Sequence, residues 1–295
     1  MASRTYRAEA IVLKTLDFGE ADRILTLLTR HFGKVSVVAK GIRRPTSRLS
    51  GHAEPLAHAT FQMARGRELD VLTGAESRAA FRTLRDDLGS IAAGWYVAEL
   101  ADRFTADHAP AAPVFDLVEN ALRHLEAGHP ASLVCRWFDL HLLDRSGFRP
   151  ELGRCVQCEG VLPETENVWS PLAGGVICAG CRRAPDQVGV PLSVRALKSM
   201  RFLLVSDFLS AARLRIDDAL AMELERSLRG FLHVVIDRDV QAARLIDQIR
   251  HLPNPGGKAL PRLSNPGPGS TSSTPAPGGP AARSGKALPR LSADA

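Results

Sequence analysis

The sequence lacks the marks of membrane and secreted proteins. No run of about 18 uncharged apolar residues occurs, which argues against a transmembrane helix. The first 30 residues carry charges of both signs and no bounded apolar stretch, so no signal peptide is indicated. We therefore expect a cytoplasmic protein without a membrane partner.

Familiar catalytic motifs are also missing. Gly33-Lys34 and Gly257-Lys258 are not followed by Ser or Thr, so neither completes a phosphate-binding loop. There is no H-E-x-x-H, no G-x-S-x-G and no dinucleotide fingerprint. The adjacent acids Asp86-Asp87 and Asp217-Asp218 are better interpreted as helix starts than as acid/base pairs. We predict no enzyme, with an enzyme built around a structural zinc as a remote alternative.

Cysteine is scarce, and four of the five form two C-x-x-C pairs with nineteen residues between them. Two such knuckles supply the four thiolates of a tetrahedral zinc site. Four thiolates leave no open position for water, so the predicted zinc is structural. An iron–sulfur cluster uses the same ligands and stays as an alternative, while the remaining Cys135 is interpreted as a buried, inert thiol. The predicted metal ligands are Cys155, Cys158, Cys178 and Cys181.

The chain divides into four stretches of different pattern. Residues 1–80 are predicted to form five short strands of a small barrel or sandwich, at 6–16, 23–29, 35–40, 57–64 and 69–75. Residues 81–251 have helical periodicity, interrupted at 152–184 by the cysteine segment, which has too few apolar residues for a core of its own. Residues 252–295 are predicted to be disordered and contain GKALPRLS twice, as a recognition motif or as a drifting duplication.

Positive charge is concentrated in one stretch. The net charge is +6, yet residues 23–50 alone hold seven basic and no acidic residues. A solvated face would explain such a run, but a basic face on a small barrel also neutralises phosphates and binds nucleic acid. Phe32 and Phe61 are either stacking surfaces there or core residues. The predicted nucleic-acid contacts are Arg23, Arg30, Lys34, Lys40, Arg43, Arg44 and Arg48.

Several runs in fixed order resemble RecO, the family of bacterial recombination mediators. They are Tyr6 to Leu16, Gly19 to Arg23, Gly33 to Arg44, and Leu142 to Pro150, which leads directly into Cys155. The resemblance covers residues 5 to 250 and implies an α+β multidomain protein. Its expected parts are an OB-fold β-barrel (1–80), an all-α domain (81–251) with an inserted zinc ribbon (152–184), and the tail (252–295).

The resemblance also implies a function in DNA repair and recombination. Members bind single- and double-stranded DNA, anneal strands coated with single-strand binding protein, and help load RecA with RecR and sometimes RecF, without nucleotide. A nucleoid-associated location would follow. Arg136 and Arg145 are the candidates for holding the acidic C-terminal tail of single-strand binding protein.

A different class of protein also fits the cysteine pattern. A zinc-ribbon transcription or RNA-binding factor would place its nucleic-acid contacts on the ribbon, around Arg154, Arg182 and Arg183. Charge reversal at Arg43 and Arg44 separates the two hypotheses, because only the barrel hypothesis predicts a loss of affinity.

Overall fold

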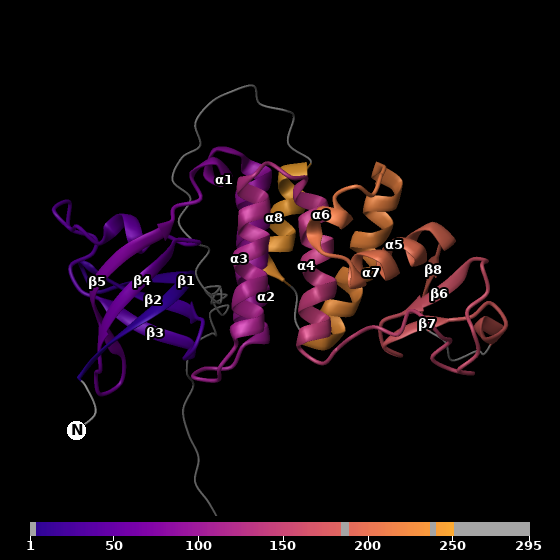
Figure 1. Cartoon of the computed structure of the whole chain (residues 1–295), viewed down its shortest axis with the longest axis horizontal. Helices are drawn as coiled ribbons and strands as arrows, with labels where there is room; N and C mark the ends of the chain where they lie inside the picture. Colours follow the sequence, from indigo (N-terminus) through magenta and orange to yellow (C-terminus); the bar gives the residue numbers. More distant parts are fainter. Residues whose placement is uncertain (1–3, 184–188, 237–239, 251–295) are drawn as a thin grey trace, which may run out of the picture. The chain divides into compact units, whose positions relative to one another are not determined.

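The computed structural model describes residues 4–183, 189–236 and 240–250 of the 295. Strands precede helices, as predicted, and a small second sheet is inserted among the helices (Figure 1). The predicted tail at 252–295, including both GKALPRLS copies, lies outside the described residues. No helix within the described residues is long and apolar enough to cross a membrane.

Five strands form a closed barrel in the order β1-β2-β3-β5-β4 (Figure 1). Neighbouring strands are antiparallel except for a short parallel pairing of β3 with β5. The prediction of a small OB-like barrel is thereby confirmed, and the sandwich is excluded. The strands are β1 (Thr5–Phe18), β2 (Asp22–Thr29), β3 (Gly33–Ala39), β4 (His58–Ala64) and β5 (Asp70–Ala79).

Alternation of side chains produces two apolar faces in the barrel. Odd-numbered residues of β2 and β3 point inward, with Leu25, Leu27, Val35 and Val37 almost fully buried in the barrel core. At one end of the barrel, the outward Leu28 is buried instead in the core of the helical part, together with Ile11 and Leu13 of β1. The barrel therefore has its own core and a second apolar contact with the helices.

The helices share one large core. The central helix α2 contacts α3, α4 and α8, and α4 also contacts α5 and α7. α2 is rich in buried alanine and glycine, so neighbouring helices approach it closely. The helices are α1 (Arg82–Asp86), α2 (Leu88–Phe104), α3 (Ala112–Glu126), α4 (Ala131–Arg145), α5 (Val194–Val205), α6 (Phe208–Ala211), α7 (Asp218–Ile236) and α8 (Gln241–Arg250).

The helix ends have ordinary capping residues. Pro130 is the N-cap of α4, and Gly147 adopts a φ of +83° just after that helix. The Ser193 hydroxyl accepts a hydrogen bond from the Ala196 amide at the start of α5. Asp87 caps α2, and the carboxylate of Asp217 accepts from the Leu220 amide in the first turn of α7, which confirms both as helix starts.

The cysteine segment supplies two strands of a three-stranded sheet in the order β7-β6-β8, and β8 follows the segment in the chain. The strands of this sheet are β6 (Asn167–Ser170), β7 (Gly175–Ile177) and β8 (Val190–Leu192). The prediction that the cysteine segment has too few apolar residues for a core of its own agrees with the structure. Several of its side chains join the core of the helical part: Leu152, Leu162, Val168, Trp169, Val176 and Ile177.

Candidate nucleic-acid interface and metal centre

The four cysteines of the two C-x-x-C pairs lie together. Their Sγ atoms are all within 4.8 Å of one another, and those of Cys158 and Cys178 are 3.9 Å apart. Tetrahedral ligands at the Zn–S distance of about 2.3 Å are separated by about 3.8 Å, so the cluster fits such an ion. The structure thus confirms that four cysteines are positioned to hold a metal.

Backbone amides prepare Cys155 to act as a thiolate. Its Sγ accepts from the Cys178 amide at 3.3 Å. Burial alone would raise the pKa of Cys155, but amide donors outweigh it and lower the pKa to about 6. The pKa of Cys181 instead rises to about 12, because its thiol bonds neighbouring sulfurs. A bound cation would therefore favour the state with four thiolates, because it balances their charge.

Trp169 of β6 ties the cysteine segment to α7. The indole is fully buried, and its Nε1 donates to the Ser227 carbonyl at 2.8 Å. Its ring meets Phe231 edge-on with centroids 5.6 Å apart. The segment is thus held by packing on a helix as well as by its cysteines. Sequence reasoning missed this contact, since one tryptophan produces no periodic signal.

Three predicted contact residues lie exposed at the end of β3 and in the loop after it. Within the described part of the chain, no carboxylate forms an ion pair with Lys40, Arg44 or Arg48. Arg43 is beside them, and only a 3.7 Å contact joins its Nε to Asp17. We call these four residues the loop cations. They form an open cationic surface that phosphates can reach.

Arg23 is more strongly paired than the loop cations. Its guanidinium contacts Asp17 at 2.8 Å and Glu54 at 3.4 Å. Burial lowers its pKa, but these carboxylates outweigh burial and raise it. Arg23 therefore holds the barrel surface together, with limited capacity to neutralise a phosphate.

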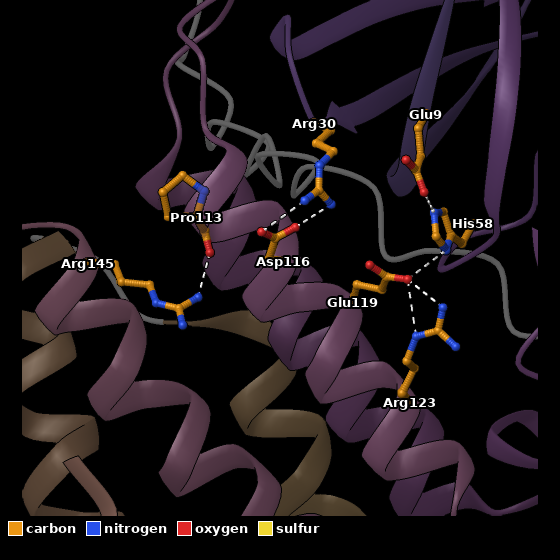
Figure 2. Close-up of polar contacts among 8 residues, drawn as sticks. All are labelled: Glu9, Arg30, His58, Pro113, Asp116, Glu119, Arg123 and Arg145. Carbon is orange, nitrogen blue, oxygen red and sulfur yellow. Dashed lines mark hydrogen bonds and ion pairs between the residues drawn. The ribbon is translucent and has the colours of Figure 1, made fainter. Parts of the chain in front are cut away.

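Lys34 and Arg30 contact the helical part instead of the open surface. Lys34 Nζ donates to the Asp102 carboxylate at 2.9 Å and to its carbonyl at 2.8 Å. Arg30 forms an ion pair with Asp116 of α3 at 2.6 Å (Figure 2). Their predicted grouping with the loop cations needs correction, because helical carboxylates already neutralise both.

The backbone at the start of β3 lies very close to the loop after α2, at the junction between the barrel and the helical part. Gly33 has a φ of +69°, and a Cβ there would lie 2.0 Å from the Ala109 carbonyl oxygen. The next residue, Lys34, accepts through its carbonyl from the His108 amide at 2.9 Å. A glycine is required at position 33 by both sterics and backbone conformation.

A buried histidine lies at the same junction. His58 Nε2 is 2.9 Å from the Glu9 carboxylate of β1, and its Nδ1 is 3.7 Å from Glu119 of α3 (Figure 2). Arg123 forms an ion pair with the same Glu119 at 2.6 Å. Burial lowers the pKa of His58 and outweighs the opposite effect of the two carboxylates.

The two predicted contacts for a partner's acidic tail differ. Arg136 is 6% exposed and its Nε lies 3.1 Å from Asp139, which also accepts from the Tyr96 hydroxyl at 2.9 Å. Burial raises the pKa of Asp139 to about 6, against the opposite effect of Arg136. Because a buried arginine cannot meet a partner, Arg136 is corrected to a core residue.

Arg145 is exposed and lines a cleft of 540 Å³. Its Nη1 donates to the Pro113 carbonyl at 2.6 Å (Figure 2). The cleft is also lined by Arg103 and by the aromatic pair Phe104 and Phe148. It combines positive charge with apolar surface.

The two predicted stacking residues are not alike either. Phe61 is fully buried in the barrel core, so the core alternative holds for it. Phe32 is 40% exposed, but its ring meets Tyr6 edge-on at 5.2 Å. Sequence reasoning did not select Leu16 and Phe18 near the end of β1, which are 45% and 52% exposed. Their spacing of two residues, which places both on one face of a strand, could have indicated them.

An OB-like barrel with a cationic loop, joined to helices and a four-cysteine segment, defines a class of nucleic-acid-binding proteins. Two family models match the chain: Recombination protein O N terminal over residues 1–81 and Recombination protein O C terminal over 85–243. The chain therefore belongs to the RecO family of DNA repair proteins.

Curated relatives agree over most of their length. A protein named DNA repair protein RecO from Roseiflexus sp. is 38% identical over 252 residues, covering 85% of this chain and 88% of the relative. One of the same name from Dehalococcoides mccartyi is 36% identical, covering 83% and 96%. Another from Symbiobacterium thermophilum is 34% identical, covering 83% and 98%.

Proposed function

We propose that the chain is a recombination mediator that binds single- and double-stranded DNA through the loop cations. It would anneal complementary strands and help load RecA on DNA coated with single-strand binding protein. The observation that carries this proposal is the exposure of Lys40, Arg44 and Arg48, with no described carboxylate paired to them. A repair family needs such a surface for phosphate backbones.

The positive charge of the loop cations would promote annealing. Two phosphate backbones repel each other, and a cationic surface that contacts both lowers this repulsion and releases their counterions. The reaction needs no nucleotide, which agrees with the lack of a phosphate-binding loop in the sequence. We accordingly propose that the protein acts without enzymatic activity.

We further propose that Cys155, Cys158, Cys178 and Cys181 hold a structural zinc ion. The support is an all-sulfur donor set at tetrahedral spacing. An iron–sulfur cluster would use the same thiolates, and absorption in the visible range of the purified protein distinguishes the two. The ion would cross-link the two knuckles and take no part in chemistry.

For the acidic tail of single-strand binding protein, the cleft at Arg145 is the proposed site. Arg145 suits a carboxylate, whereas Arg103 is paired with Glu99 at 2.8 Å, and the Phe104–Phe148 pair suits an apolar end. Arg145→Glu should abolish binding of a peptide with that tail sequence and slow annealing of coated strands. Annealing of naked strands is the internal control, and an equal loss there would contradict the assignment. RecR, RecF and RecA remain partners that family membership implies.

The rival placement of contacts on the ribbon has less support. Arg182 forms an ion pair with Glu166 at 3.2 Å, and Arg154 donates to the Glu159 carbonyl at 3.3 Å. The side chain of Arg183 lies outside the described residues. Arg182 is thus paired with a carboxylate, whereas Lys40, Arg44 and Arg48 have no such partner among the described residues.

The direct test is annealing of complementary strands coated with single-strand binding protein. The double variant Arg43→Glu/Arg44→Glu should anneal both coated and naked strands more slowly than wild type. Arg213→Glu/Arg226→Glu, which alters two exposed arginines of the helical part by the same charge, is the matched control. Wild-type rates in the loop variant would refute the proposed function.

A further inference from the structure

The outward face of β1–β3 has a distinct surface at the end remote from the helices. Register pairs Leu16 with Ile24 and Ile24 with Val38, so three apolar side chains form a row across the strands. Phe18 is next along β1 on the same face, opposite Asp22. The row and Phe18 together are called the apolar platform.

One face thus has two different ends. At the helical end, Leu28 is fully buried beneath the helices. At the other end, Leu16 is 45% and Phe18 is 52% exposed. In a barrel whose remaining large apolar side chains are mostly buried, exposure of two adjacent ones indicates a binding surface.

The backbone holds the platform in position. The Gly41 amide donates to the Asp22 carboxylate at 2.7 Å, and the Arg43 amide donates to the Ala21 carbonyl at 2.9 Å. These bonds join the β1–β2 turn to the loop that contains the loop cations. The backbone on both sides of the platform is therefore held in place, which lowers the ordering cost on binding.

Several basic side chains lie near this apolar surface. Lys14 precedes Leu16 on the same face and is exposed, as is Lys40 at the end of β3. Arg43 reaches the turn itself, with its Nη1 3.5 Å from the Gly19 carbonyl. Of the acids near the platform, Asp17 contacts Arg23 and Arg43, Asp22 accepts from the Gly41 amide, and Glu20 is exposed in the turn. One aromatic ring on an apolar surface near cations suits a polyanion with flat apolar groups, namely a nucleic acid with unpaired bases.

We propose that Phe18 stacks on an unpaired base of single-stranded DNA, with Leu16 beside it, while the loop cations hold the flanking phosphates. This inference rests on the proposed function and adds strand selectivity to it. Bases in a duplex are already stacked on each other, so the platform favours single strands only. Phosphate contacts, in contrast, serve both forms.

Substitution of Phe18 tests the selectivity. Phe18→Ala should weaken binding of a single-stranded oligonucleotide by about tenfold, the ordinary effect of losing one stacked base, and leave duplex binding unchanged. Phe202→Ala, on a ring that is 41% exposed in α5, should change neither. Phe18→Trp should keep wild-type selectivity.

The Phe18→Trp variant also provides a spectroscopic readout. Native tryptophans lie at positions 95, 137 and 169, outside the barrel. A base stacked on the introduced indole should quench its emission on addition of oligo(dT), and duplex should not. The wild-type titration gives the background from the native tryptophans.

The outcomes separate this inference from the proposed function. Stacking is refuted if Phe18→Ala lowers single-strand and duplex affinity equally. It is also refuted if the variant changes neither affinity. If DNA binding is unchanged but binding of a protein partner is lost, the platform is a protein interface and the inference fails. The Arg43→Glu/Arg44→Glu variant tests the proposed function separately, because it should weaken both forms of DNA.

Discussion

The barrel and the cysteine segment are stabilised in different ways. The barrel alternates inward apolar residues, such as Leu25 and Val37, that form its own core. The cysteine segment depends on four clustered thiols and on one tryptophan buried against α7. In the barrel, the residues that fold the chain point inward and the loop cations lie outside. In the cysteine segment, the four cysteines and Trp169 stabilise the fold, which is consistent with the proposed placement of DNA binding on the barrel.

Of the changes that test this comparison, loss of a cysteine should lower stability the most. Cys155→Ser or Cys178→Ser removes a thiolate, and structural zinc contributes about 10–16 kcal/mol of apparent free energy in small zinc-binding peptides. We expect loss of bound zinc, a lowered melting temperature and poor solubility. Metal analysis and thermal unfolding measure these effects. DNA binding by the fraction that stays folded should persist, and its selective loss would make the ribbon a contact surface.

Trp169→Ala should have the next largest effect. Emptying a fully buried indole site typically lowers the free energy of unfolding by about 3–5 kcal/mol, and here the hydrogen bond to Ser227 is lost as well. Urea unfolding measures the change. Leu172→Ala, at a side chain that is 70% exposed, is the control and should be nearly neutral. A small effect for Trp169→Ala would mean that the metal and the other buried apolar side chains hold the segment without the indole.

Lowering the pH should have a smaller effect on stability, through His58 at the barrel–helix junction. Burial lowers the pKa of His58, so the unfolded chain binds a proton more readily than the folded one. This contribution to stability is complete above the unfolded pKa of about 6.5 and declines as pH falls below it. His124 and His141, whose pKa values burial also lowers, change stability in the same direction.

His58→Gln isolates the contribution of this histidine. The variant should have a flatter dependence of unfolding free energy on pH between 7.5 and 5.5 than wild type, with the slope from the other histidines remaining. Its stability at pH 7.5 can differ from wild type without affecting this test. An unchanged slope would show that His58 stays neutral or stays charged in both states.

Much of the fold could be predicted from local pattern. All five strands follow from alternation and turns, and the cysteine cluster follows from the spacing of two knuckles. The helix α2 is harder to predict from the sequence, because it is buried on several sides and has little amphipathic contrast. Trp169 is harder still, since its partner Ser227 is 58 residues away in the chain.

The charge prediction shows where sequence reasoning is limited. Residues 23–50 contain no acid, yet the structure brings Asp17 and Glu54 to Arg23, and Asp102 to Lys34. Charge balance depends on neighbours in space, which a single sequence does not reveal. Only the loop cations remain where the sequence placed them, on an open surface.

The dependence of DNA affinity on salt tests the central claim most directly. Each phosphate contact to a single strand contributes about 0.7 to the slope of log affinity against log salt concentration. Arg43→Glu/Arg44→Glu should therefore reduce that slope by about 1.4 or more, while its zinc content stays that of wild type. An unchanged slope and affinity would contradict the assignment of DNA binding to the loop cations.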